Sequence, residues 1–151
     1  PFRGFLSLLS VEDQMRTLEN IAQHLGPNGR LVFDVFLPDI ELLVETSGNA
    51  RYLRDVTNSE KRLVLWHQTQ FDNYNQIMDV TIIADQLDNL GVSQKRFYRS
   101  YQIRYIYRWE LHHLLSSCGY EITALYGDFN HSDFDESSTE MVLVTRLKTK
   151  I

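Results

Sequence analysis

A single carboxylate interrupts the most apolar stretch of this sequence. Asp34 lies in the run Leu31–Phe36, whose other residues are Leu, Val and Phe. A buried carboxylate is costly unless it is paired or lies at the solvated end of a strand. Because ligands of open α/β sheets bind at the carboxyl ends of the strands, Asp34 and Phe36 are candidates for lining a pocket. A purely structural role for both is the alternative.

Aromatic and basic residues gather in a second segment, which runs from Arg96 to Arg108. Arginine makes bidentate contacts with anions, and aromatic rings stack on flat ligands. The segment, with Tyr105 and Arg108 near its end, therefore predicts a substrate wall for an anionic or aromatic molecule. Stacked cross-strand pairs on a half-exposed strand explain the same pattern and are the alternative.

Metal chemistry is not indicated by the histidines, the cysteine or the acidic residues. His112 and His113 have no Cys or carboxylate at ligand spacing. The acidic segment 128–136 lacks the glycine and the terminal glutamate spacing that a calcium loop needs. The one cysteine, Cys118, lies near a predicted helix end beside leucines, which favours a small core residue over a nucleophile. Because it cannot form an internal disulfide, a reducing cytoplasm is favoured.

The composition favours one globular domain. The 151 residues are 43% hydrophobic, which is enough for a sizeable core. A formal net charge of -5 argues against nucleic acid as the main partner. No apolar run approaches the ~20 residues that span a membrane, so we expect no membrane partner. The sequence opens at Pro1 without a signal peptide, and we expect it to be cut from a longer protein or processed.

The element that precedes Asp34 is a helix, predicted over 11–25. Ser10 is a suitable N-cap, and two acidic residues in the first turn oppose the helix dipole. Apolar residues then recur at spacings of three and four, which gives one buried stripe. Gly26 is expected to adopt the left-handed conformation that ends a helix, and Pro27 prevents continuation.

A central strand is predicted at Leu31–Phe36. The turn Pro27-Asn28-Gly29 precedes it, and Pro38-Asp39 ends it. Since the run does not alternate with polar residues except at Asp34, both of its faces are expected to be buried. The short loop from the preceding helix indicates an α/β sheet.

The segment 49–105 has a different residue pattern, in which runs of β-branched and aromatic residues are separated by clusters of Asn, Asp, Ser and Gly. Its loops are too short for crossover helices, so an antiparallel meander is expected. A second helix follows at about 108–118 and ends at Gly119. The strands predicted in the meander are 51–57, 63–71, 76–83 and 94–105, and those after the second helix are 121–126 and 141–145.

This order of elements resembles the C-terminal portion of a class I S-adenosylmethionine-dependent methyltransferase of the small-molecule type, over almost the whole chain. The resemblance implies an α/β fold, in which a partial Rossmann-like sheet (strands five to seven with flanking helices) carries an inserted antiparallel meander. It also implies one domain, with core portions 1–48 and 106–151 and a substrate-side sheet 49–105. The residues that carry it are 2–5, 12–14, 24–31, 34–38, 108–111, 114–115, 118–120 and 126–129.

Three residues correspond, by resemblance, to the loop after strand four. Phe2, Arg3 and Phe5 would lie near the methionine end of S-adenosylmethionine; docking of Phe5 on the core at a frayed terminus is the alternative. No catalytic residue is assigned, although Asp34 is a hypothetical base for a hydroxyl or amine acceptor. The candidates for binding a small-molecule methyl acceptor are Asp34, Phe36, Tyr105 and Arg108.

The glycines depart from the family. Such enzymes hold the cofactor on a Gly-rich loop after the first strand, whereas none of the seven glycines here forms a G-x-G cluster. We therefore expect the first four strands, and most of the cofactor site, to be absent. Leu31–Phe36 would then present an unpaired apolar edge. We expect a homo-oligomer, or a missing N-terminal segment, to cover it.

The favoured function is thus that of a truncated methyltransferase, which alone cannot bind its cofactor fully. Two alternatives stay open. One is a non-catalytic partner or orphan domain that associates through its sheet edge. The other is an unrelated α+β domain whose meander encloses a small apolar ligand.

Overall fold

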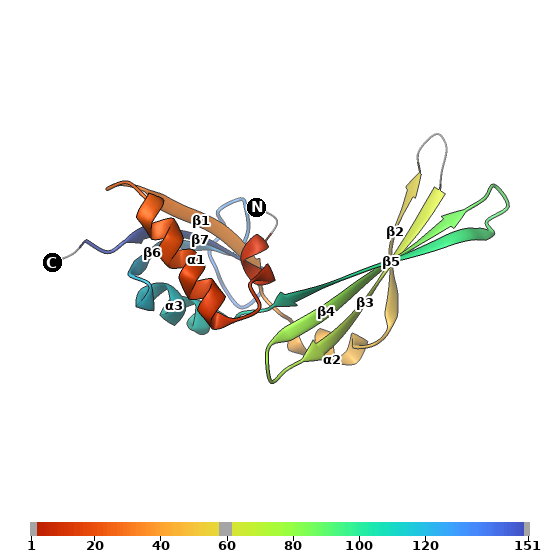
Figure 1. The fold of residues 1–151 in the computed structure, drawn as a ribbon, viewed down its shortest axis with the longest axis horizontal. Helices are drawn as coiled ribbons and strands as arrows, with labels where there is room; N and C mark the ends of the chain where they lie inside the picture. The colour runs from red at the N-terminus through yellow and green to blue at the C-terminus, as the bar shows by residue number, and fades with distance from the viewer. Residues whose placement is uncertain (1–2, 58–61, 150–151) are drawn as a thin grey trace. The chain divides into compact units, whose positions relative to one another are not determined.

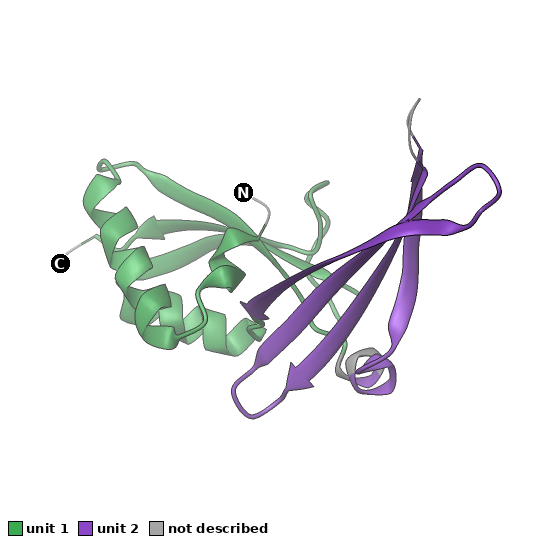
Figure 2. Cartoon of the chain, turned by 45° about the vertical axis from the view of Figure 1, so that its right-hand side comes forward, with its two compact units in different colours: residues 1–39, 104–151 green, residues 40–103 purple. Residues whose placement is uncertain are grey.

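The computed structural model describes residues 3–57 and 62–149, and Phe2 lies outside them. The chain divides into two compact units, one formed by Pro1–Asp39 with Arg104–Ile151 and the other by Ile40–Ile103 (Figure 2). The elements, labelled in Figure 1, are η1 (Gly4–Ser7), α1 (Val11–His24), β1 (Arg30–Phe36), α2 (Ile40–Thr46), β2 (Ala50–Thr57), β3 (Arg62–Asp72), β4 (Ile77–Leu87), β5 (Ser93–Arg104), α3 (Arg108–Ser117), β6 (Tyr120–Tyr126) and β7 (Glu140–Leu147).

The first unit contains a three-stranded sheet in the order β1-β7-β6. β7 is antiparallel to both neighbours, with Val35 opposite Met141 and Leu125 opposite Leu143. The last strand in sequence is therefore inserted beside β1, as the resemblance implied for strands five, seven and six. The prediction of a partial Rossmann-like sheet is confirmed.

Both helices of this unit pack on one face of the sheet. The hydroxyl of Tyr120 in β6 donates to the carbonyl of Leu18 in α1 at 2.8 Å, and both residues are fully buried. Side chains of α3 share a cavity with Met141 and Leu143 of β7 on the same face. Because side chains alternate along a strand, Val35 and Phe33 of β1 both lie on this covered face.

The expectation that β1 is buried on both faces is wrong. Val35 is completely buried, but Val32 is 58% exposed, and burial along the strand is incomplete on that side. The physical reason is that α1 and α3 cover the face of Val35 and leave the face of Val32 partly open. An unbroken apolar run shows that both faces of a strand are hydrophobic. It does not show which elements of the fold cover each face.

The N-terminus of α1 is as predicted, and its C-terminus is not. The Ser10 hydroxyl accepts from the backbone N–H of Asp13 at 3.1 Å. The helix ends at His24, and Gly26 is absent from the described glycines with positive φ. The expected left-handed Gly26 is therefore wrong, because a residue before proline is driven towards extended backbone.

The second unit is a four-stranded antiparallel sheet in the order β2-β3-β4-β5, which confirms the predicted meander. The helix α2, which the sequence analysis did not predict, lies against β3. It begins directly after Pro38-Asp39, where the proline suggested only the end of a strand. The backbone N–H of Gly48, just after the helix, donates to the carbonyl of Thr69 in β3 at 2.7 Å and ties this end of the helix to the sheet.

Candidate functional site

One polar cluster forms at the carboxyl half of β1. The Nε of Arg3 lies 3.5 Å from Asp34, and its Nη2 donates to Glu140. The guanidinium also lies 5.7 Å from the ring centre of Phe36. Phe36 and Glu140 are direct cross-strand partners, so Asp34, Phe36 and Glu140 share one face of the sheet. Arg3 thus bridges two carboxylates that lie far apart in the sequence.

Glu140 is the most unusual member of the cluster. Its Oε2 is buried and has no hydrogen-bond partner among the described residues. Burial raises the pKa of the Glu140 carboxyl, and the charge of Asp34 raises it further, against the opposing effect of Arg3. A carboxylate with one unoccupied buried oxygen can accept a hydrogen bond from an incoming donor group.

A separate hollow opens at the N-terminus of α3. This cavity of about 460 Å³ is lined by Leu37, which follows β1, and by Tyr107, Trp109 and Phe134 among others. The Arg108 guanidinium lies 4.8 Å from the Trp109 ring centre and 5.1 Å from that of Phe134. Such a cation between two rings forms a flat, partly apolar wall. The wall suits a small organic ligand better than an ion.

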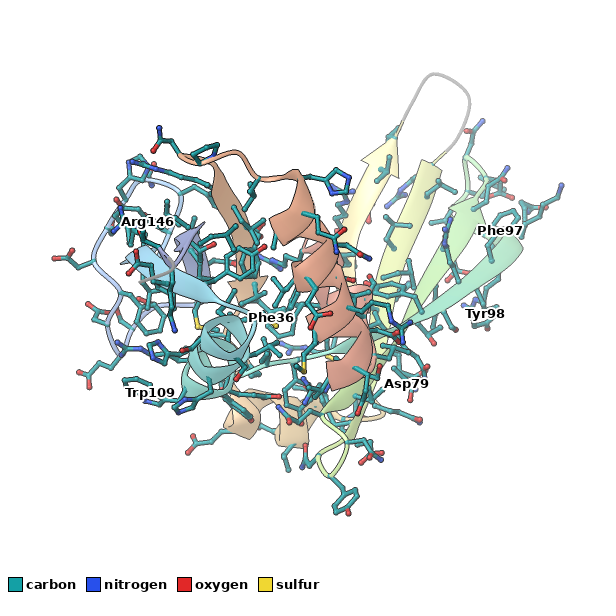
Figure 3. The ribbon with its side chains drawn as sticks, turned by 60° about the vertical axis from the view of Figure 1, so that its left-hand side comes forward. Phe36, Asp79, Phe97, Tyr98, Trp109 and Arg146 are labelled. Atoms are coloured by element: carbon teal, nitrogen blue, oxygen red, sulfur yellow. The ribbon has the colours of Figure 1, made fainter. Side chains whose placement is uncertain are left out.

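Trp109 also borders a smaller cavity of about 210 Å³. Its other lining residues include His112 of α3, Leu125 of β6 and Leu143 of β7. Trp109 is 61% exposed and lies at the margin of its helix in Figure 3. Trp109 therefore borders both hollows of the first unit.

The structure brings some predicted site residues together and separates others. Arg3, Asp34 and Phe36 form one cluster. Phe5 instead packs on Phe33, with ring centres 5.2 Å apart, on the face that the helices cover. Tyr105 is buried and meets the Tyr107 ring edge-on at 5.9 Å. Arg108 belongs to the second hollow, and Phe2 is not described.

Three residues of these clusters were not predicted from the sequence. Glu140, Trp109 and Phe134 carry no local signal, because each becomes part of a site only through the register of β7 or the position of a loop. A search for carboxylates at the ends of predicted neighbouring strands would have found Glu140.

Two further side chains narrow the possible chemistry. Burial raises the pKa of the Cys118 thiol, with a smaller contribution from Glu19, which disfavours the thiolate nucleophile. Within the part of the chain that the structure describes, no group of three His, Cys, Asp or Glu side chains could hold a metal ion. The described helices include none long and apolar enough to cross a membrane.

Comparison with solved structures shows the fold. An S-adenosylmethionine-dependent methyltransferase from Clostridium acetobutylicum is 14% identical with a TM-score of 0.74, over 96% of this chain and 55% of its own. The CcbJ methyltransferase from Streptomyces caelestis is 24% identical with a TM-score of 0.75, over 95% of this chain and 57% of its own. CalS10, an amino pentose methyltransferase from Micromonospora echinaspora solved with S-adenosylmethionine, is 14% identical with a TM-score of 0.66, over 91% of this chain and 52% of its own.

The chain therefore has the fold of the corresponding part of these methyltransferases and spans about half the length of each. No family model and no curated protein matches the sequence. At these identities, the similarity establishes architecture and not the reaction.

The described glycines do not form the backbone cradle that a cofactor such as S-adenosylmethionine needs. A backbone cradle for such a ligand needs glycines where a strand turns into a helix. The described glycines that leave no room for a side chain are Gly29 and Gly127, and neither precedes a helix. Gly29 enters β1, and Gly127 follows β6.

Proposed function

We propose that this chain is the acceptor-side part of an S-adenosylmethionine-dependent methyltransferase acting on a small molecule. The observation that carries the proposal is the β1-β7-β6 order with an antiparallel β7, together with a similarity that covers nearly all of this chain but about half of each methyltransferase. The clusters around Asp34 and Arg108 supply the surfaces that a small acceptor needs.

The division of labour follows from the chemistry of methyl transfer. S-adenosylmethionine, when bound, supplies an activated methyl group, so the protein mainly contributes alignment and a dry cavity. Asp34 and Glu140 accept hydrogen bonds from an acceptor hydroxyl or amine, and one of them can take its proton. The rings of Trp109 and Phe134 hold the flat or apolar part of the acceptor.

This chain alone is proposed not to hold the cofactor. Titration calorimetry of the 151-residue chain with S-adenosylmethionine should give no saturable heat, and binding would contradict this part of the proposal. Sequencing the gene upstream of Pro1 is the companion test. A strand followed by a Gly-rich turn and a helix, within about 100 residues, supports a complete methyltransferase, and its absence favours a non-catalytic binding partner.

If the longer polypeptide transfers methyl groups, Asp34→Asn tests the acceptor side. Loss of a base lowers kcat by roughly 100-fold or more with little change in KM for S-adenosylmethionine. Glu121→Gln, a surface carboxylate of β6 that pairs with Arg146, is the matched control. An unchanged rate in Asp34→Asn would remove the proposed role of this carboxylate.

We also propose that, in the 151-residue chain by itself, the free edge of β1 is covered by a second copy of the chain; in a longer polypeptide an N-terminal segment would cover it instead. β1 pairs with β7 on one side only, within the described sheet, and carries the exposed Val32. Unpaired strand edges with apolar side chains favour association. Multi-angle light scattering should show a dimer that Val32→Lys dissociates, whereas a stable monomer would contradict it.

A further inference from the structure

The two faces of the four-stranded sheet in the second unit differ in charge. On one face, Arg62 pairs with Asp55 at 3.0 Å. Arg96 pairs with Asp85 through two contacts, at 2.7 and 2.8 Å. The charges of these two pairs therefore cancel on this face. Arg96 therefore shows which side chains of β5 lie on this face.

The orientation of β5 is fixed by two further side-chain contacts with β4. Thr81 and Ser100 share a hydrogen bond of 2.9 Å, and Gln102 donates to Asp79 at 2.7 Å. Ser100 and Gln102 therefore lie on the face of the ion pairs, together with Arg96. Because strand side chains alternate, Lys95, Arg99 and the other odd-numbered residues from there to Ile103 lie on the opposite face. Ser93, at the start of the strand, instead donates to Asp85.

Among the strand residues that the structure describes, that opposite face carries cations and no acids. Arg51 and Arg54 of β2 lie opposite His67 and Leu65 of β3 and so belong to it. Lys95 and Arg99 are its cations on β5. All four are exposed, and none makes an ion pair within the described part of the chain. The other strand residues of the face are Val56, Leu63, Thr69, Phe71, Met78, Val80, Ile82, Ala84, Gln86, Phe97, Tyr101 and Ile103.

We call this surface the basic face. Its cations lie on the two outer strands. Its centre on β3 and β4 is mostly apolar, with Leu65 opposite Ala84 and His67 opposite Ile82. Met78 and Val80, towards the β3–β4 turn, are buried, so the open part of the centre is the part around Leu65 and Ile82. The outer strands lie about 14 Å apart, from three strand spacings of roughly 4.8 Å. Phe97 and Tyr101 add rings that are 53% and 48% exposed, and Phe97 lies at the outer part of β5 in Figure 3.

We propose that the basic face binds an amphipathic helix of a partner protein, with an apolar stripe flanked on both sides by Asp or Glu. A helix is about 10 Å wide, so it fits over β3 and β4 between the two cationic edges. Acidic flanks match cations on both sides, which gives orientation and a faster association rate. The twist of the sheet, visible in Figure 1, suits a rod better than a planar membrane. The inference does not depend on methyl transfer.

The test uses a fluorescein-labelled helical peptide of about 20 residues, with Leu along one stripe and Glu on both flanks. A matched peptide replaces every Glu by Lys. Fluorescence anisotropy should show saturable binding of the Glu peptide, at least about tenfold tighter than the Lys peptide and weakened by salt. Amide resonances of β3 and β4 should shift on binding.

Variants on the protein sharpen the result. Arg51→Gln with Arg99→Gln, one cation from each edge, should weaken binding of the Glu peptide about tenfold. Arg62→Gln with Arg16→Gln removes the same charge away from the basic face and should change it less than about twofold. Circular dichroism melting verifies that each variant is folded. The substituted side chains are all exposed, which favours intact folding.

Several results would overturn the proposal. They are absence of binding, equal affinity for the two peptides, or equal effects of the two double variants. Vesicles rich in phosphatidylserine and a single-stranded oligonucleotide are run in parallel. Binding of either through Arg51 and Arg99, without binding of the Glu peptide, would assign the basic face to a different class of partner and also overturn it.

Discussion

The guanidinium of Arg3 lies 3.5 Å from the carboxylate of Asp34 and joins the start of the described chain to the carboxyl half of β1. Arg3 holds this position with a left-handed backbone, φ 55°, which is uncommon for a residue with a side chain. The ion pairs with Asp34 and Glu140 offset that conformational cost. They fix the turn before η1 against the candidate acceptor site.

Replacing Arg3 by Ala should destabilise the protein by about 1 kcal/mol. The substitution removes two partly exposed ion pairs and leaves two neighbouring carboxylates without their cation. Urea unfolding followed by circular dichroism measures the change. Arg16→Ala, which removes an exposed pair with Asp13 on α1, is the control and should cost less than about 0.5 kcal/mol. Equal effects of the two substitutions would argue against a special role for Arg3.

Glu140→Gln should stabilise the protein at pH 7. Burial raises the pKa of Glu140 in the folded state, so the folded protein favours the protonated carboxyl. That stabilising contribution is fully present below the ordinary pKa of 4.5 and is lost as the pH rises through the raised folded value. Glutamine mimics the protonated group at every pH.

The measurement is thermal melting of both proteins between pH 3 and pH 8. The advantage of the variant should grow with rising pH and vanish below the ordinary pKa. A variant that is less stable at pH 7 would mean that the ion pair with Arg3 outweighs the cost of burial.

Tyr120→Phe should cost about 1 kcal/mol. The phenol hydroxyl donates to the Leu18 carbonyl in a fully buried position and ties β6 to α1. Tyr126→Phe, which removes a hydroxyl from a half-buried residue of the same strand, should leave the free energy of unfolding nearly unchanged. Denaturant midpoints of the two variants give the comparison. A small effect at Tyr120 would indicate that water replaces the lost hydroxyl.

Gly119→Ala should destabilise the protein by roughly 1 kcal/mol, and Gly26→Ala should not. Gly119 follows α3 with φ +82°, a conformation that strains any side chain, although an added Cβ there would meet nothing. At Gly26 a Cβ also meets nothing, and the backbone is not left-handed. Thermal melts of the two variants therefore separate backbone strain at a positive φ from the general effect of replacing a glycine after a helix. Similar losses at both sites would contradict this account.

The sequence predicted those elements whose limits are set by local chemistry. The Ser10 cap fixed the start of α1, and Gly119 fixed the end of α3, because both act on their own backbone. The prediction at Gly26 was wrong, because the following proline restricts the backbone of Gly26 to extended conformations and so outweighs the conformational freedom of a glycine. The exposure of Val32 and the helix α2 could not be predicted, because each depends on which elements pack nearby.

The candidate site was predictable in part for the same reason. Asp34 was conspicuous as a charge in an apolar strand. Its partner Arg3 was named only through resemblance, and Glu140 was missed. Their association depends on the register of β1 with β7, in which Phe36 meets Glu140. Register is set by tertiary packing and leaves no trace in a local pattern.

The pairing of β1 with β7 also has a kinetic consequence. Arg30 must find Arg146 across nearly the whole chain, whereas each strand of the β2–β5 meander pairs with its immediate successor. Contacts that close long loops form slowly, and short-range ones form early. The second unit should therefore collapse first and shorten the loop that the late β1–β7 closure must span.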